Sequence, residues 1–149
     1  MFKNDGPDGD LCQIYHKNGV LKYLGQMKQG KKEGLGQEFY DNNHKKYQGE
    51  FFKGKRHNRQ AIIYYPNGNR MFSGKLIEGH KTSRGKIFHD NGVLKYDGEF
   101  EKDEAQGEEC FLYHHNGKIE YSGPLVNGVK VGFGKQFYDN GYLFYEGSF

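Results

Sequence analysis

Apolar and polar residues alternate in short runs along the chain. In the run Leu94–Phe100, for example, Tyr96, Gly98 and Phe100 stand at every second position. Side chains two residues apart share one face of a β-strand, so this run predicts a strand with one buried face. Similar runs recur from one end of the chain to the other. The pattern therefore predicts an all-β protein built from short strands.

The alternating runs recur at a regular spacing. The three-residue motif aromatic-x-Gly recurs along the chain in steps of 24, 25, 24, 25 and 24 residues. The six copies begin at Tyr23, Tyr47, Phe72, Tyr96, Tyr121 and Tyr145. Each period can hold two strands and a turn, and a single hairpin is only marginally stable, so neighbouring periods must stack. The spacing predicts an elongated solenoid of about six stacked antiparallel β-hairpins.

Turn residues occupy two fixed places in each period. Asn-Gly precedes the aromatic residue by five positions in every copy except the second, where Asn42-Asn43 takes its place. Because Asn-Gly tolerates positive φ, we expect a type I′ hairpin turn there. Another glycine follows each aromatic-x-Gly glycine by five positions, with Asp103 in one copy. We expect these residues to carry the chain into the next hairpin.

The glycines of the strands lead to two further expectations. Each aromatic-x-Gly glycine lies between two large side chains, so we expect a ring of an adjacent hairpin to cover it. The clearest cases are Gly49, Gly98 and Gly123. A Gly-x-Gly motif at Gly34/Gly36 is lost at Asn58/Gln60. We therefore expect an irregular strand over residues 58–65, which either sets the register of a bound partner or has simply diverged.

These residues resemble the MORN repeat family, whose motif runs approximately Tyr-x-Gly-x-aromatic-x-x-Gly-x-x-x-Gly-x-Gly. The segment from Tyr121 to Gly134 matches it closely, although Leu125 fills the aromatic slot. The resemblance implies an elongated, twisted strip of hairpins. It also implies an adaptor role, because the members are mostly scaffolds of cilia and the cytoskeleton, membrane-junction proteins, or segments beside enzyme domains. Phosphoinositide binding has been proposed for some members. The family has no catalytic residues, so none are carried over.

The resemblance covers essentially the whole chain, as one array over residues 1–149. Its periods are a partial repeat at 1–22, full repeats at 23–46, 47–71, 72–95, 96–120 and 121–144, and the start of another at 145–149. Phe2 and Phe149 stand at the same phase, six periods apart. Neither end carries the polar capping repeat that solenoids normally need. We therefore expect the ends to pack on further repeats or on another chain, or the array to be an accessory domain of a larger protein.

Composition determines what kind of core such an array can build. The chain has 12 Tyr, 12 Phe and 23 Gly, and hydrophobic residues make up 34% of it. Aliphatic side chains are scarce, so burial must come from aromatic rings in a thin, extended layer. The net charge of +3 does not indicate nucleic acid, and rings that could stack on bases are needed in the core. We expect no nucleic-acid partner.

The cysteines and the hydropathy bear on location. Cys12 and Cys110 lie far apart and outside any CxxC pair, which favours two reduced thiols. No apolar run is long enough for a signal peptide or a membrane span. These features predict a cytoplasmic location, with association to the cytoskeleton or to a membrane surface left open.

Motifs for catalysis or cofactor binding are weak. Gly79-His80-Lys81-Thr82 lacks the contiguous Gly-Lys-Ser/Thr of a phosphate-binding loop, and the repeat already explains its glycine. The seven histidines have no cysteine or carboxylate partners at metal-ligand spacing. The sequence predicts a protein that is not an enzyme, with no catalytic residues, no cofactor and no metal.

Charge is distributed unevenly along the array. Nine basic and four acidic residues lie between Lys28 and Arg59, whereas seven acids and one base lie between Asp97 and Glu109. One interpretation is a solvated surface that protects exposed strand edges from aggregation. The other is a basic end that binds anionic membrane lipids. The candidate lipid patch consists of Lys31, Lys32, Lys45, Lys46, Lys53, Lys55, Arg56 and Arg59.

We expect the array to be a non-catalytic protein-interaction scaffold or adaptor. A partner segment, either a helix or an extended peptide, would bind across several repeats. The residues best placed to give specificity alternate with the fixed aromatics: Gln48, Ser73, Asp97, Ser122 and Glu146. The alternative is a peripheral membrane module that binds anionic lipids, such as phosphoinositides, through the basic repeats.

Overall fold

The computed structural model describes residues 2–3 and 6–149, with side chains from Asp8 onward, and every regular element in that part is a β-strand. The strands are β1 (Phe2–Lys3), β2 (Gly6–Pro7), β3 (Gly9–Tyr15), β4 (Leu21–Lys28), β5 (Lys31–Phe39), β6 (Lys45–Phe52), β7 (Lys55–Arg56), β8 (Asn58–Tyr64), β9 (Arg70–Ile77), β10 (His80–Phe88), β11 (Leu94–Glu101), β12 (Glu104–Ala105), β13 (Gly107–Tyr113), β14 (Ile119–Val126), β15 (Val129–Lys130), β16 (Phe133–Phe137) and β17 (Leu143–Ser148). The all-β prediction is confirmed.

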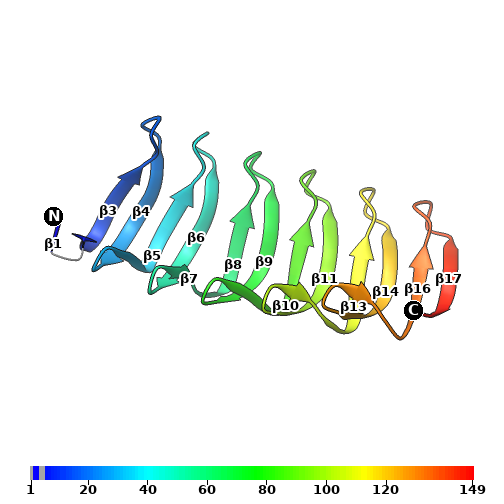
Figure 1. Cartoon of the computed structure of the whole chain (residues 1–149). Helices are drawn as coiled ribbons and strands as arrows, with labels where there is room; N and C mark the ends of the chain where they lie inside the picture. Colours follow the sequence, from blue (N-terminus) through cyan, green and yellow to red (C-terminus); the bar gives the residue numbers. More distant parts are fainter. Residues whose placement is uncertain (1, 4–5) are drawn as a thin grey trace.

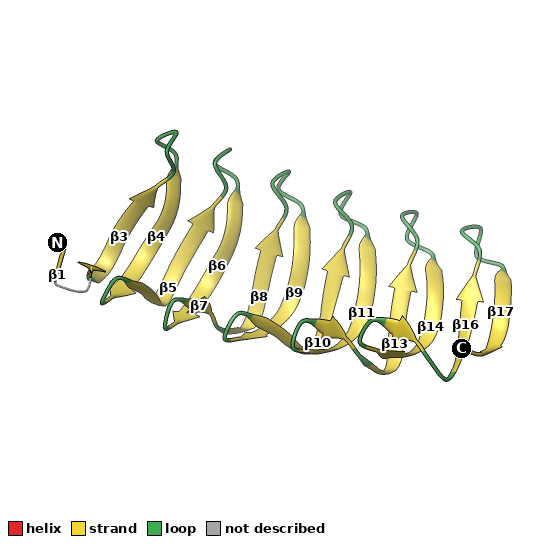
Figure 2. Ribbon diagram, in the orientation of Figure 1, coloured by secondary structure: helices red, strands yellow, loops and turns green. Residues whose placement is uncertain are grey.

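Apart from the β1–β2 pair, the strands form one open antiparallel sheet of 15 strands. The long strands follow one another in chain order from β3 to β17, and the short strands β7, β12 and β15 pair with β6, β11 and β14. Figure 1 shows the hairpins side by side in a row with the termini at opposite ends, and Figure 2 shows loops above and below them. The predicted elongated solenoid of stacked antiparallel hairpins is confirmed.

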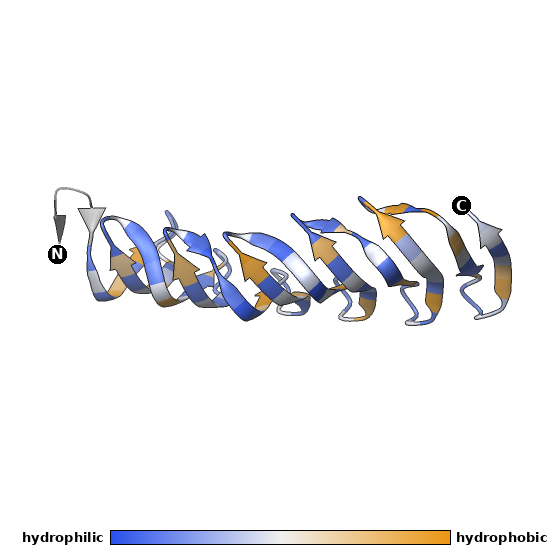
Figure 3. Ribbon diagram, turned by 90° about the horizontal axis from the view of Figure 1, so that it is seen from below, coloured by the Kyte–Doolittle hydropathy of each residue, from blue (hydrophilic) through white to orange (hydrophobic). Residues whose placement is uncertain are grey.

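The core is a thin layer of side chains on one face of the sheet. The strand register aligns these side chains, so that Tyr47 lies opposite Ile63 and Ile63 opposite Phe72. Phe51 inserts its ring edge-on between Tyr23 and Tyr47, with ring centroids 5.5 and 5.2 Å away. Seen from below, every hairpin carries hydrophobic positions between hydrophilic ones (Figure 3). Edge-to-face contacts of this kind hold the layer together.

Glycines allow the tyrosine rings to lie against the strands. A Cβ atom at Gly98 would collide with the hydroxyl of Tyr96, two residues earlier on the same strand. That hydroxyl donates a hydrogen bond of 2.6 Å to the Glu99 carbonyl, and four other hairpins repeat the arrangement. We expected a ring of an adjacent hairpin to cover Gly49, Gly98 and Gly123, and this prediction is wrong. Each of these glycines is covered by the tyrosine ring of its own strand. A ring of an adjacent hairpin does cover Gly36, which lies beneath Tyr23.

Two kinds of connection between hairpins alternate, so the structural unit is a pair of hairpins, 49 residues long. The connections of the first kind turn at residues 29–30, 78–79 and 127–128. Each is followed by a residue with left-handed backbone, and these residues recur at the 49-residue spacing: Gly34, Ser83 and Gly132. After the other connections, at Lys53–Gly54 and Lys102–Asp103, a small side chain pairs with a glycine of the next strand, at Ala61 and Cys110. In the first hairpin Cys12 pairs with Gly25 in the same way.

Strand β8 (Asn58–Tyr64) has register shifts between Asn58 and Ala61 and between Ile63 and Tyr64, so the expected irregularity is present. Strands β3 and β13 carry the same shifts one unit before and after, so the irregularity belongs to the 49-residue unit and is not peculiar to this strand. Ala61 pairs with Gly74, just as its counterpart Cys110 pairs with Gly123 one unit later. The missing Gly-x-Gly motif reflects the second kind of connection. The expected equivalence of Phe2 and Phe149 concerns a side chain outside the described part of the chain.

The two sets of turns differ from their predicted types. At the Asn-Gly turns only the glycine is left-handed, as at Gly19 (φ 88°), whose amide donates to the His16 carbonyl. This is the pattern of a type I turn followed by a left-handed residue, so the predicted type I′ turn is wrong there. At the opposite ends of the strands both turn residues are left-handed, as at Gln29 (φ 52°) and Gly30 (φ 75°). These are the type I′ turns. The residues that replace glycine in the two sets are also left-handed: Asn43 and Asp103.

Candidate interaction surface

The five residues predicted to give partner specificity lie in one row across the sheet, on the face opposite the core. Gln48 lies opposite Ile62, Ile62 lies opposite Ser73, and similar pairs continue to the last strand. From β3 to β17 this outer row consists of Gln13, Leu24, Gln37, Gln48, Ile62, Ser73, Lys86, Asp97, Phe111, Ser122, Lys135 and Glu146. The fold therefore brings together residues from all six hairpins.

The outer row mixes polar and apolar side chains. Two of the five predicted residues, Gln48 and Glu146, are exposed, and the other three are half-buried. Arg84 Nη2 lies 2.9 Å from Asp97 Oδ1, close enough for an ion pair. That oxygen nevertheless accepts no well-oriented hydrogen bond from the described residues. Because Asp97 Oδ1 is buried, it is Arg84 that balances its charge.

Two grooves open along the outer row, one 49-residue unit apart. The first, the leucine groove, has a volume of 510 Å³ and is lined by Leu11, Leu24 and Leu35 together with glutamines. Leu11 is 75% exposed and Leu35 is 65% exposed. The second, the basic groove, has a volume of 640 Å³. It is lined at the equivalent positions by Gln60, Ser73 and Arg84, with Arg59 and Lys75 beside them. The backbone shape repeats while the chemistry changes from apolar to basic.

The predicted lipid patch does not form one surface. Lys45 and Lys46 begin β6, whereas Lys53 and Lys55 lie beyond its other end. A strand of this length separates the two pairs by roughly 23 Å. Arg59 lies elsewhere again, in the basic groove.

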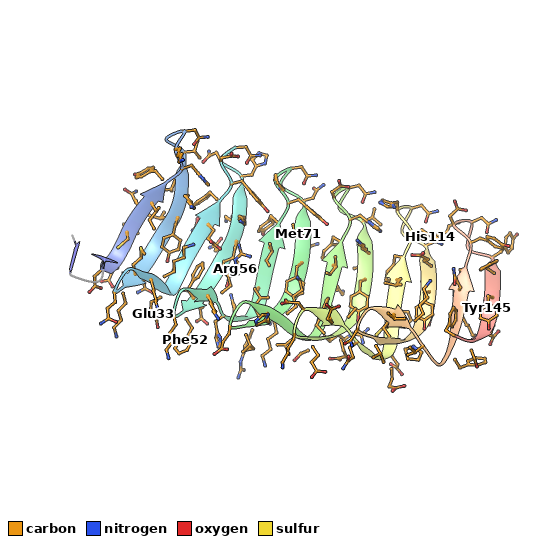
Figure 4. All side chains as sticks on the ribbon, viewed as in Figure 1. Glu33, Phe52, Arg56, Met71, His114 and Tyr145 are labelled. Atoms are coloured by element: carbon orange, nitrogen blue, oxygen red, sulfur yellow. The ribbon has the colours of Figure 1, made fainter. Side chains whose placement is uncertain are left out.

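Two residues of the patch, Lys31 and Lys53, lie together with Lys28 at the lower edge of the first two hairpins, beside Glu33 and Phe52, which are labelled in Figure 4. Lys28, Lys31 and Lys53 line an open groove of 860 Å³ there, together with Glu33 and the exposed ring of Phe52. We call the three lysines the lower basic cluster. Lys28 and Lys31 are direct cross-strand neighbours, so their like charges repel each other. A bound anion would relieve that repulsion.

Two other residues of the patch are held in an internal ion-pair network. Glu38 accepts hydrogen bonds from Lys32 Nζ and Arg56 Nε, both at 2.7 Å. Burial by itself would raise the pKa of Glu38, but the two cations outweigh it and hold that pKa below its ordinary value. Lys32 also lies over the Tyr23 ring and Arg56 over the Tyr47 ring. These two cations are therefore engaged in the fold.

Three histidines join successive hairpins. His16, His89 and His114 each place Nε2 between 2.8 and 3.1 Å from a main-chain carbonyl of the next hairpin. Tyr40 and Tyr65 make the equivalent contact in two other hairpins. Among the described residues, no three His, Cys, Asp or Glu side chains form a cluster that could hold a metal ion. In the same part of the chain, no helix is long and apolar enough to cross a membrane.

No protein-family model matches this chain, and no curated protein matches it either. The resemblance to MORN repeats therefore stays a prediction that rests on the residues themselves.

Proposed function

We propose that this chain is a non-catalytic protein-interaction scaffold of the MORN type, whose partner lies along the outer row across several hairpins. The observation that carries the proposal is the outer row itself, a continuous strip of changing side chains behind a core that repeats in every hairpin. Packing explains the repeated rings. It places little demand on the outer row, which is therefore free to specify a partner.

An elongated partner fits this surface best. Twelve strands at about 4.8 Å spacing make a strip of roughly 53 Å. A specific interface buries about 800 Å² on each partner, more than the short strands of one hairpin supply. The leucine groove suits an apolar side chain, and the basic groove suits an acidic one. The partner segment, a helix or an extended peptide, would carry these two residues roughly 19 Å apart, the width of four strands.

Site-specific photo-crosslinking tests the proposal. A benzophenone side chain introduced singly at Gln48, Ser73 or Ser122 should capture the same protein from a native extract. The turn positions Lys17 and Lys118 serve as controls and should not capture it. Capture from the turn positions alone, or a different protein from each position of the outer row, would refute a shared binding face.

Binding of anionic lipid is a second candidate function, supported by the lower basic cluster and the exposed Phe52 beside it. The chain should sediment with phosphatidylcholine vesicles that contain phosphatidylserine or a phosphoinositide, and salt should weaken this binding steeply. Lys31→Glu with Lys53→Glu should abolish it. The matched control, Lys45→Glu with Lys46→Glu, should not. Equal losses in the two pairs, or no sedimentation at low salt, would remove this candidate.

A further inference from the structure

A second row of side chains runs beside the outer row, and every member of it is aromatic. In each hairpin, the residue two positions after the first outer-row residue is Tyr or Phe. Residues two positions apart on a strand share one face. Tyr15 shows this directly, because its hydroxyl donates to Gln13 Oε1 at 3.0 Å. We call these six residues the ring row: Tyr15, Phe39, Tyr64, Phe88, Tyr113 and Phe137.

The ring row lies on the face opposite the core and remains accessible inside the array. Phe39, Tyr64 and Tyr113 are half-buried, so each shows part of its ring to solvent. Phe88 is buried, and the guanidinium of Arg70 lies over it, 5.0 Å from the ring centroid. Arg70 itself stands opposite Tyr64 in the strand register. The surface is therefore a periodic series of rings with a cation over one of them.

One ring per hairpin sets the spacing that an elongated partner must match. Two strands at about 4.8 Å separate successive rings by about 9.6 Å. A polyproline II helix repeats every three residues, or about 9.3 Å, so it drifts from the ring row by about 1.5 Å over all five steps. Seven residues of α-helix span about 10.5 Å and drift by about 4.5 Å, roughly half a spacing. An extended strand turns every third side chain to the opposite face. Of these three conformations, polyproline II alone stays in phase with all six rings.

The outer row supplies hydrogen-bond donors beside the rings. Gln48 Oε1 accepts from Lys45 Nζ at 2.6 Å, and the amide nitrogen of Gln48 makes no hydrogen bond within the described part of the chain. Gln13 is arranged in the same way, since its oxygen is the acceptor for Tyr15. Each of these amides therefore offers an NH2 group to a partner. A polyproline II helix has no internal hydrogen bonds, so its carbonyls can accept from such donors.

We propose that the partner segment is a proline-rich polyproline II helix that lies along the ring row. One face of the helix packs a proline on each accessible ring, and its carbonyls accept hydrogen bonds from the outer row. Proline suits this site because its fixed φ sets the conformation before binding, which lowers the entropy cost of ordering the segment. The ring row spans roughly 48 Å and takes about 16 residues. The proposal rests on the function proposed above and adds the conformation of the partner.

Calorimetry with oligoproline peptides, blocked at both ends, tests the proposal on the full chain. The affinity should rise at least about tenfold from six prolines to eighteen, because the longer peptide reaches more rings. It should rise little beyond eighteen, since about 16 residues already span the row. No binding of the eighteen-residue peptide at about 1 mM, or an affinity that does not depend on length, would overturn the proposal. Equal binding of an alanine-rich helix of the same length would overturn it too.

Two matched pairs of variants locate the site. Gln48→Glu keeps the oxygen that accepts from Lys45 but removes the NH2 donor, so it should weaken binding of the uncharged peptide about fivefold. Gln29→Glu makes the same charge change at a lower turn and should have no effect. Tyr64→Ala should weaken binding about tenfold or more, whereas Phe52→Ala, which removes an exposed ring at the lower edge, should not. Because Gln48 is exposed, its variant remains informative even if Tyr64→Ala unfolds. Equal losses in a variant and its control would contradict the ring row as the site.

Failure of this proposal can be told apart from failure of the proposed function. If crosslinkers on the outer row capture one shared protein while the eighteen-residue oligoproline does not bind, the partner has another conformation and the present proposal alone is wrong. If the crosslinkers capture no shared protein, the proposed function is wrong and the polyproline II partner falls with it.

Discussion

Each hairpin fixes one aromatic ring in the same way, against a glycine two residues further along the strand. Where the ring is tyrosine, its hydroxyl finds an acceptor on the main chain of its own strand, so the ring can join the core with its polar group satisfied. Burial, followed by the charge of Glu38, raises the pKa of Tyr23 to about 12. In one hairpin Phe72 takes the place of tyrosine. The ring and the glycine are thus the common requirement.

Replacing Gly98 with valine should lower the free energy of unfolding by about 1–3 kcal/mol, because the new side chain overpacks the core. It would collide with the Tyr96 hydroxyl and approach Cys110 Sγ, which lies 3.1 Å from the Cβ position. Chemical denaturation measures the effect. Cys110→Ala is the control and should cost about 1 kcal/mol or less, since Ala61 already fills the same place one unit earlier. A neutral Gly98→Val would contradict this role of the glycine.

Glu38→Gln should lower the free energy of unfolding at pH 7 by about 1–3 kcal/mol, because Lys32 and Arg56 lose their charged partner. The pKa of Glu38 is lowered in the folded protein. Its stabilisation is therefore fully present above the unfolded pKa of about 4.3 and is lost as pH falls through the folded pKa. Denaturation across this pH range should show the difference between the two proteins shrinking in acid. A constant difference would contradict the charge-based explanation.

At the scale of the hairpin, the turn asparagine acts in two directions. Asn116 Oδ1 accepts from the Lys118 amide within its own turn, and Nδ2 donates to the Asp139 carbonyl of the next hairpin. Equivalent pairs of bonds recur at the four preceding turns. At the opposite ends of the strands, main-chain amides bridge successive connections, as from Gly79 to the Arg56 carbonyl. The stack is therefore held at both ends of a thin core.

Two substitutions of Asn116 separate its two bonds. Asn116→Asp keeps the acceptor and loses the donor, so it should cost about 0.5–1.5 kcal/mol, whereas Asn116→Ala loses both and should cost about twice as much. The free energy of unfolding of each variant provides the comparison. Equal costs would mean that the bond within the turn contributes nothing, and an Asn116→Asp variant as stable as the unmodified chain would contradict a contribution from the bond to the next hairpin.

The sequence predicts the strands well and the turns less well, for a physical reason. Alternation depends on residues two positions apart, so Tyr96, Gly98 and Phe100 reveal their shared face locally. Asn-Gly suits a type I′ turn, but it also suits a type I turn followed by a left-handed glycine. The choice depends on the register shift beside the turn, such as the one between Leu112 and Tyr113. That shift belongs to the pairing of two strands rather than to the turn residues.

At the scale of the whole molecule, one face of the sheet repeats while the other varies. The outer row could be anticipated from residues that alternate with the aromatics. The leucine groove could not, because Leu11, Leu24 and Leu35 lie on three strands and only the register brings them together. The sequence did contain one signal for this groove. Leu11 and Leu35 are apolar, whereas the residues at the same positions one unit later, Gln60 and Arg84, are polar.

The predicted lipid patch does not form a single surface, because a count of charges along the chain does not show toward which face or which end of a strand each side chain lies. Glu38 draws Lys32 and Arg56 against the core, whereas Lys45 and Lys53 lie at opposite ends of one strand. Neighbours in sequence were thus separated by the fold.

Removing one 49-residue unit should leave a folded, shorter sheet. Deletion of residues 49–97 joins Gln48 to Gly98 and preserves the alternation of faces. Small-angle scattering should show a particle about 19 Å shorter, the width of four strands. Deletion of residues 49–96 is the control. It shifts Gly98 and Phe100 to the wrong face relative to Tyr47 and should prevent cooperative folding. A folded control, or an unfolded first deletion, would contradict the modular account.

The claim that one partner spans several hairpins is tested most directly by its dissociation constant, measured by calorimetry with the partner captured at the outer row. Leu24→Glu, Ile62→Glu and Phe111→Glu each change the outer row in a different unit and leave the core face intact. We predict that each of the three substitutions weakens binding at least about tenfold, the effect of losing roughly 1.4 kcal/mol of contact. If one substitution abolishes binding while the other two leave the dissociation constant unchanged, the partner occupies a single hairpin and the shared-face account is wrong.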